Sequence, residues 1–274
     1  MIAQRIDGRA LAENIRREVR ETITREQLRP GLGVLLVGSD PASHLYVALK
    51  ERAAAEAGVY FVKQLLPDDA TQEQVIENIK LFNADPKIDG ILLQLPLPQH
   101  VALSAIDAII AAIDPHKDVD GFHPNTTVVA PLVRAVECLL KATKQNYQGV
   151  RATLLVNSET LGNPLARCIE LLGAEPTLCI YPESGICETA AQSGILITAI
   201  GQRYAVTPAS VQQGATVIDI GTTRVGSRVF GDADPMVSEK AAFISPVPGG
   251  VGPLTVAYLL ANLVQLNQAH RAER

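Results

Sequence analysis

The sequence lacks the features that mark membrane, secreted and nucleic-acid-binding proteins. No apolar stretch approaches the roughly 18 residues that a membrane span needs, and the richest one, Leu103 to Ile113, is interrupted by Asp107. The segment Met1 to Arg9 has no apolar core of the kind that a secretory signal requires. No run of basic residues could neutralise adjacent phosphates, and the net charge is −5. We therefore expect a cytoplasmic protein with neither a nucleic-acid nor a membrane partner.

Cysteine is also scarce. The four cysteines show neither the C-x-x-C spacing of a zinc site nor the density of a secreted disulfide scaffold: Cys138, Cys168, Cys179 and Cys187. Free cysteine packs as a small hydrophobic residue. We therefore expect four reduced thiols that are mostly buried, and no metal site.

What the sequence does contain is a repeated alternation of strand and helix. Its 274 residues exceed the usual size of one domain, which favours two cores joined by a cleft. Gly33 to Val37 is a continuous apolar run, typical of a strand that is covered on both faces. Asp40 and Pro41 then cap and open a helix that is predicted to stop at Gly58.

Two further strands are predicted in the same half of the chain. They are Val59 to Leu66 and Asp89 to Pro96. Between them, Thr71 and Gln74 form a capping box at the start of a helix that reaches about Asn83. Parallel strands present their carboxyl ends at one edge of the sheet, and ligands bind at that edge.

The pattern restarts after Asp120-Gly-Phe-His-Pro124. The predicted elements are a helix over 131–144, a strand over 153–156, a helix over 161–172, and strands near Thr177, Ile195 and Val217. The expected fold is therefore α/β, with two three-layer α/β domains, the second Rossmann-like, and a cleft between them. We expect domains at 1–122 and 123–252, with an amphipathic C-terminal helix, 253–274, that joins the first domain.

Polar side chains that could carry chemistry gather near the first strand. Tyr46 and Lys50 share a helix face, and Ser43 lies one turn earlier. Alone, such a pair is more often a surface lysine beside a half-buried tyrosine, but Gln94 and the segment 117–121 favour a functional role. Gln94 stands inside the apolar run 91–97 and must find hydrogen-bond partners, either nearby backbone groups or a lysine amine. A partly desolvated lysine would have a pKa shifted toward neutrality, which suits a base or proton relay.

Two loops add to this group. Asp118 and Asp120 flank Val119, so in an extended segment they point the same way, although aspartates in a loop usually form only a solvated turn. The segment Pro246-Val-Pro-Gly-Gly-Val-Gly-Pro253 is rich in proline and glycine. It either lets bare backbone approach a flat ligand or forms a rigid interdomain loop.

Together these motifs resemble the bifunctional methylenetetrahydrofolate dehydrogenase/methenyltetrahydrofolate cyclohydrolase family. The resemblance covers nearly the whole chain, through Ile6-Asp-Gly8, Val37-Gly-Ser-Asp-Pro-Ala-Ser43, Tyr46-Val47, Lys50, Gly90-Ile-Leu-Leu-Gln-Leu-Pro-Leu-Pro98, Lys117-Asp-Val-Asp-Gly121 and Pro246-Val-Pro-Gly-Gly-Val-Gly-Pro253. It implies a homodimeric enzyme of one-carbon metabolism that acts on tetrahydrofolate derivatives. The implied reactions are hydride transfer from the methylene bridge to the nicotinamide of NADP, then water attack on the methenyl cation.

The resemblance also implies a role for each matching residue. Lys50 would be the catalytic base or proton relay, and Tyr46 would pack on the folate. Gln94 would tune Lys50, and Asp120 would bind the pterin edge. The implied substrate-binding residues are Ser43, Pro248, Gly249, Gly250 and Gly252.

The nucleotide turn departs from the family pattern G-x-S-x-x-V-G-x-P, because it reads Val156-Asn-Ser-Glu-Thr-Leu-Gly-Asn-Pro164. Three positions still match and remain cofactor-binding candidates: Ser158, Gly162 and Pro164. Val156 replaces a glycine and is expected to obstruct the phosphates, while Glu159 and Glu183 add negative charge. We therefore expect NADP to bind weakly or not at all. The alternative function is a catalytically reduced folate-binding or regulatory paralogue that does not bind NADP.

Overall fold

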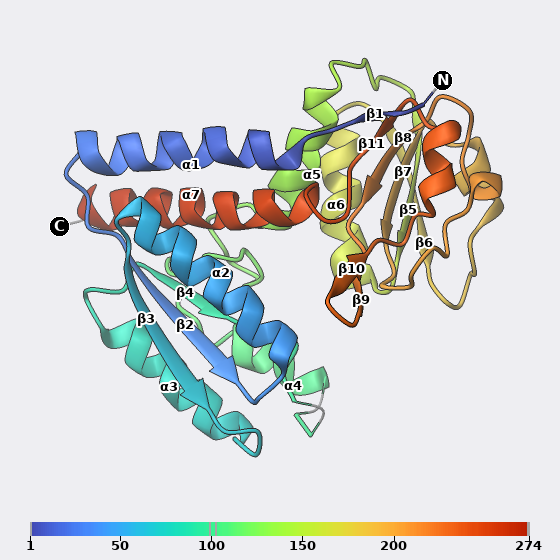
Figure 1. The fold of residues 1–274 in the computed structure, drawn as a ribbon. Helices are drawn as coiled ribbons and strands as arrows, with labels where there is room; N and C mark the ends of the chain where they lie inside the picture. The colour runs from blue at the N-terminus through green and yellow to red at the C-terminus, as the bar shows by residue number, and fades with distance from the viewer. Residues whose placement is uncertain (1, 99, 102, 273–274) are drawn as a thin grey trace. The chain divides into compact units, whose positions relative to one another are not determined.

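Figure 1 shows the fold of the chain in a computed structural model, which describes residues 2–98, 100–101 and 103–272. The chain forms two compact α/β units. The six-stranded unit comprises the residues up to Ala12 together with Leu132–Thr255, and the three-stranded unit comprises Glu13–Pro131 and the residues from Val256 on. The α/β class with a Rossmann-like second sheet is confirmed. The domain boundary at residue 122 stays a prediction, and residues 273–274 of the expected last helix lie outside the described part.

The three-stranded unit is built on a parallel sheet with the strand order β3-β2-β4. Its strands are β2 (Gly31–Val37), β3 (Tyr60–Leu66) and β4 (Gly90–Leu93). Its helices are α2 (Pro41–Ala57), α3 (Gln72–Ala84) and α4 (Leu103–Ile110), with most of α1 (Gly8–Arg25) and of α7 (Val251–Ala272). None of the helices that the structure describes is long and apolar enough to cross a membrane.

Strand β2 is buried along its whole length because helices cover both faces of the sheet. Val34 and Leu36 face a core shared with α1, α2 and α7. Leu35 and Val37 face a second core shared with α3 and α4. Alternate side chains of a strand point to opposite faces, so two apolar cores require the unbroken apolar run in the sequence.

The helix ends follow the capping residues of the sequence. Asp40 caps α2 by accepting a hydrogen bond from the Ser43 amide at 2.8 Å, and Gly58 ends the helix with a φ of 78°. The capping box of Thr71 and Gln74 is present at the start of α3. These three predictions are confirmed. Helix α1 was not predicted, although it is amphipathic.

The six-stranded unit has a parallel sheet with the order β1-β11-β8-β7-β5-β6. Its strands are β1 (Gln4–Arg5), β5 (Arg151–Val156), β6 (Glu175–Ile180), β7 (Ile195–Ala199), β8 (Thr216–Asp219) and β11 (Phe243–Ile244). A hairpin of β9 (Thr223–Val225) and β10 (Arg228–Phe230) stands apart from this sheet. The helices are α5 (Pro131–Ala142) and α6 (Glu159–Leu171), with 3-10 helices η1 (Glu188–Gln192), η2 (Pro208–Ser210) and η3 (Pro235–Glu239).

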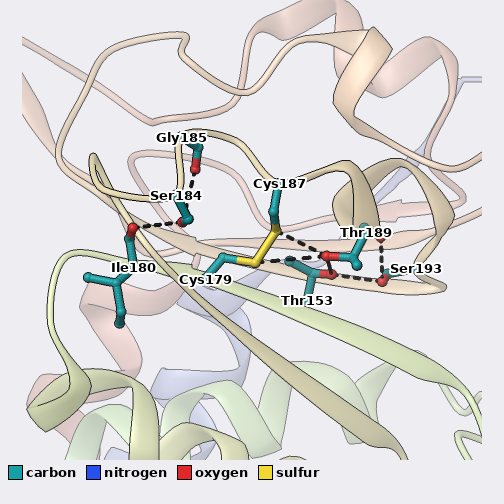
Figure 2. Close-up of a disulfide and its surroundings, with 8 residues drawn as sticks. All are labelled: Thr153, Cys179, Ile180, Ser184, Gly185, Cys187, Thr189 and Ser193. Atoms are coloured by element: carbon teal, nitrogen blue, oxygen red, sulfur yellow. Dashed lines mark hydrogen bonds between the residues drawn. A yellow bond between two sulfur atoms is a disulfide. The ribbon is translucent and has the colours of Figure 1, made fainter.

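The expectation of four reduced thiols is wrong for two of them. Cys179 and Cys187 form a disulfide between the end of β6 and the start of η1 (Figure 2). The chain turns back between these residues, which brings their Cα atoms to 6.5 Å. Cys138 and Cys168 are free, and Cys168 is buried as expected.

Candidate active site

The polar residues of the three-stranded unit gather where its strands end. Gln94 directly follows β4, and its backbone amide still donates to the carbonyl of Leu35 at 2.9 Å. The segment around Asp118 runs parallel to β4, with a bridge between Asp118 and Ile91. Asp120 therefore leaves the sheet at the same edge as Gln94, as the carboxyl ends of parallel strands must.

Lys50 and Gln94 are in direct contact. The Lys50 Nζ donates to Gln94 Oε1 at 2.9 Å, and Gln94 Nε2 donates to the carbonyl of Leu95 at 2.6 Å. The Gln94 side chain is buried, so both of its polar atoms need the partners they have. Of the two alternatives left open for Gln94, a backbone partner and a lysine amine, the structure contains both.

Burial shifts the pKa values of Lys50 and Asp120 in opposite directions, which brings the two values closer together. Desolvation lowers the pKa of Lys50, and the negative charge of Asp120 opposes this shift. Desolvation also raises the pKa of Asp120 to about 6, against the attraction of Lys50 and with added repulsion from Asp118. An amine with a lowered pKa, fixed by an amide oxygen, gives up its proton more readily than a free lysine, as a proton relay requires.

Asp118 and Asp120 have different roles in this loop. Asp118 is almost fully buried, and its carboxylate accepts from the backbone amides of Asp120, Gly121 and His123 at 3.2, 3.0 and 2.8 Å. It fixes the turn that presents Asp120. A small hollow beside the pair has mostly apolar walls, lined by Ile91, Leu93, Leu95, Ile110, Ile113 and Phe122.

Lys117 has a structural role that the sequence pattern does not indicate. Its buried Nζ donates to the carbonyls of Phe82, Asn83 and Asp85, at 3.3, 2.8 and 3.0 Å. These carbonyls lie at the carboxyl end of α3, where backbone acceptors lack partners within the helix. Lys117 thus caps α3 and anchors the start of the Asp118 loop.

Tyr46 and Ser43 differ in how open they are. The Tyr46 side chain is 43% exposed, as a residue that packs on a ligand must be. Ser43 is buried, and its hydroxyl donates to Asp40 Oδ2 at 2.8 Å. The structure therefore gives Ser43 a role at the start of α2, and its substrate-binding role stays a prediction.

The proline- and glycine-rich loop belongs to the six-stranded unit. Its backbone conformation and close packing require glycine at two positions. Gly249 has a φ of 112°, which disfavours any side chain, and a Cβ on Gly250 would lie 2.7 Å from the carbonyl oxygen of Pro246. The substrate-binding roles of Pro248, Gly249, Gly250 and Gly252 stay predictions.

The nucleotide turn lies between β5 and α6. Ser158 caps α6, because its hydroxyl accepts from the Leu161 amide at 3.4 Å. A Cβ on Gly162 would lie 2.3 Å from Leu178 Cδ1, so glycine lets the helix pack closely on the sheet. Val156 is fully buried, with a methyl 3.0 Å from that same Cβ position. The expected obstruction by Val156 is therefore wrong, because its side chain is fully buried between β5 and α6.

The negative charges that the sequence indicates near the nucleotide turn are exposed in the structure. Glu159 is the first residue of α6 and is exposed, and Glu183 is exposed in the loop after β6. Pro164 lies within α6. An acidic residue in the first turn stabilises a free helix and competes with a bound phosphate for the same partial charge.

The raised pKa of Asp120 gives a prediction about stability. A carboxyl with a folded pKa above its unfolded value contributes stability at low pH that is lost as the pH rises through the folded value, here about 6. Asp120→Asn is therefore expected to raise the free energy of unfolding by about 2 kcal/mol near pH 8, and the gain should disappear by about pH 3. Urea unfolding at both pH values measures it. Asp107→Asn, at an exposed position, is the control, and an equal change in both variants would contradict the assignment.

Comparison with known proteins gives matches over almost the whole chain. Residues 6–120 match the profile of the tetrahydrofolate dehydrogenase/cyclohydrolase catalytic domain, and residues 131–271 match the profile of its NAD(P)-binding domain. A protein of Nitratiruptor sp., named bifunctional protein FolD, is 38% identical over 96% of this chain and 97% of its own length. The protein of that name from Desulfovibrio desulfuricans is 41% identical over 95% of this chain and 96% of its own.

Solved structures agree with these matches. The Trypanosoma brucei methylenetetrahydrofolate dehydrogenase-cyclohydrolase, solved with NADP and an inhibitor, superposes with a TM-score of 0.92 and 32% identity over 99% of each chain. The bifunctional enzyme of Campylobacter jejuni gives a TM-score of 0.90 and 33% identity over 98% of this chain and 99% of its own.

Proposed function

The chain belongs to the tetrahydrofolate dehydrogenase/cyclohydrolase family, and from this premise we propose that it converts tetrahydrofolate one-carbon units by methylene oxidation and methenyl hydrolysis. The observation that carries the proposal is the hydrogen bond between Lys50 and Gln94 beside the Asp120 carboxylate. These three residues match the family motifs, and burial lowers the pKa of Lys50, as the proposed proton relay needs.

In the hydrolysis, Lys50 acts as a proton relay. A water molecule attacks the methenyl carbon, a C–O bond forms, and the water proton passes to the neutral Lys50 amine. The C–N bond then breaks, Lys50 returns its proton to the departing nitrogen, and the hydroxyl proton leaves to solvent, which gives a formyl group. Gln94 Oε1 holds the Lys50 Nζ in place throughout. A lowered pKa suits this step because a fixed ammonium would repel the cationic substrate.

Substrate orientation falls to the other matching residues. The exposed Tyr46 ring lies one helical turn from Lys50 and would pack on the flat pterin and aryl rings. Asp120, held by the turn around Asp118, would accept from the N–H groups of the pterin edge. The family resemblance also implies substrate-binding roles for Ser43 in the three-stranded unit and for the backbone of Pro248, Gly249, Gly250 and Gly252 in the six-stranded unit, and we propose these roles.

The six-stranded unit fits a dinucleotide. Ser158 caps a helix that starts directly after β5, and Gly162 allows that helix to approach the sheet, as dinucleotide-binding folds require. Ser158, Gly162 and Pro164, in the nucleotide turn, would bind the phosphates of the cofactor. A nicotinamide cofactor bound there supplies the hydride acceptor for methylene oxidation. We propose that NADP binds weakly, because Glu159 and Glu183 place negative charge near its phosphates.

Two assays test the proposed function. Purified protein with methenyltetrahydrofolate and no nucleotide is expected to hydrolyse the substrate well above the uncatalysed rate. Calorimetric titration with NADP is expected to give a dissociation constant weaker than about 1 μM. Absent hydrolysis would favour the alternative, a catalytically reduced folate-binding or regulatory paralogue. Tight NADP binding would contradict the proposed weak binding and would support an NADP-dependent dehydrogenase activity.

The assembly and location are proposals that rest on the family resemblance. We propose a homodimer in the cytoplasm. Light scattering behind size-exclusion chromatography measures the assembly, with a mass of twice the 29.3 kDa chain as the expected result. A monomeric mass at micromolar concentration would contradict it.

A further inference from the structure

The loop after β6 occupies the position that distinguishes two nicotinamide cofactors. β5, α6 and β6 form the first β-α-β unit of the nucleotide fold, with Val156 paired to Ile180. In such folds the pyrophosphate lies at the helix start after the first strand, and a group about 20 residues later, at the end of the second strand, reads the adenosine ribose. The Tyr181 amide donates to the Val156 carbonyl at 2.7 Å, so this loop begins beside the nucleotide turn.

The loop is held in a defined turn. The Cys179–Cys187 disulfide closes it at its base (Figure 2). Inside it, the Ser184 amide and hydroxyl both donate to the carbonyl of Ile180, at 2.9 and 2.7 Å. The Gly185 amide donates to the carbonyl of Pro182 at 3.0 Å. Glu183 is therefore presented to solvent from a cross-linked turn, with little freedom for the backbone to withdraw it.

The two segments that would face the phosphates carry charge of one sign only. Neither the nucleotide turn nor the loop over 181–187 contains lysine or arginine, and each contains one glutamate. The loop after β7 carries Arg203, whose guanidinium stacks over the rings of Phe230 and Tyr204, at 3.9 and 4.7 Å. A ribose 2′-phosphate needs a basic partner, whereas a ribose diol needs an acceptor such as a carboxylate.

We propose that Glu183 makes the nucleotide unit select NAD over NADP. This inference rests on the proposed function and names the cofactor of that same site. The carboxylate accepts hydrogen bonds from the ribose hydroxyls of NAD and repels the additional phosphate of NADP. The weak NADP binding proposed above then reflects a change of cofactor from NADP to NAD, and the chain retains the dehydrogenase reaction with NAD.

Calorimetric titration of both nucleotides tests the inference without requiring turnover. The native protein is expected to bind NAD about 10- to 100-fold more tightly than NADP. Glu183→Ser should weaken NAD binding several-fold and strengthen NADP binding about tenfold, and Glu183→Arg should favour NADP. Glu170→Gln, near the opposite end of α6 from Ser158, is the matched control and should leave both affinities unchanged.

Three results would overturn the inference: native protein that binds NADP as tightly as NAD, native protein that binds neither, or Glu183→Ser that shifts both affinities by one factor. Methenyl hydrolysis without nucleotide separates this failure from that of the proposed function. If hydrolysis persists and NAD is not preferred, the cofactor assignment alone is wrong. If hydrolysis is absent, the proposed function fails whatever the titration gives.

Discussion

Lys50→Met is expected to slow methenyltetrahydrofolate hydrolysis by about 10²–10⁴-fold, the usual contribution of a positioned acid–base group. Methionine keeps the length of the side chain and removes the amine that donates to Gln94 Oε1, which is the proposed proton relay. The loss should fall on kcat, because the proposed proton transfer occurs in the transition state, while substrate binding is proposed to rest on Tyr46 and Asp120. Stopped-flow absorbance of the methenyl chromophore measures the rate.

A second lysine provides the control for this substitution. Lys63 is exposed on β3, where it pairs with Glu51, so Lys63→Met is expected to retain the native rate. Circular dichroism should be native-like for both variants. Native-like hydrolysis by folded Lys50→Met would remove Lys50 from the mechanism and leave Gln94 as a structural amide.

Much of the fold could be predicted because local signals and long-range packing agree. Asp40 and Gly58 mark the ends of α2 through side-chain and backbone chemistry that acts within a few residues. The apolar run of β2 predicts burial on both faces without knowledge of its neighbours. In contrast, β1 and β11 are two residues long and exist only through pairing across most of the sequence, so no periodic pattern marks them.

The candidate site divides in the same way. The contact of Lys50 with Gln94 is consistent with a rule of topology, since α2 begins and Gln94 lies at the carboxyl edge of one sheet. The cap of α3 by Lys117 and the Cys179–Cys187 disulfide depend on where loops return, which spacing alone does not reveal. The obstruction expected of Val156 fails for a related reason: side-chain direction at the end of a strand depends on the pleat, and the pleat turns this residue inward.

Asp232→Ala is expected to reduce the free energy of unfolding by about 3 kcal/mol, the largest stability loss predicted for this chain. Asp232 is fully buried, and its carboxylate accepts from the Thr198 hydroxyl and from the amides of Ile200 and Gln202, at 3.0, 2.8 and 2.9 Å. Alanine leaves these donors without their acceptor. An unsatisfied buried donor costs roughly 1–3 kcal/mol, so the three together outweigh the benefit of removing a buried charge.

Removing the buried charge of Asp232 also removes a repulsion on the neighbouring carboxylate of Asp219. Burial and the charge of Asp232, acting against the backbone amides that lower it, raise the pKa of Asp219 to about 7. The stability that Asp219 contributes is therefore present at low pH and is lost as the pH rises through about 7. In Asp232→Ala the repulsion disappears, the pKa of Asp219 falls, and the stability of the variant should depend less on pH between about pH 5 and 8.

Urea unfolding followed by circular dichroism, at both ends of that pH range, separates the two effects. Asp232→Asn is the matched variant, because it removes the charge but keeps one oxygen for the amide hydrogen bonds; its loss should be smaller than that of Asp232→Ala, with the same flattening against pH. Equal losses in both variants would mean that charge, and not the acceptor, holds the loop after β7. A native midpoint for Asp232→Ala would show that the amides of Ile200 and Gln202 find other acceptors, and the stabilising role of Asp232 would be ruled out.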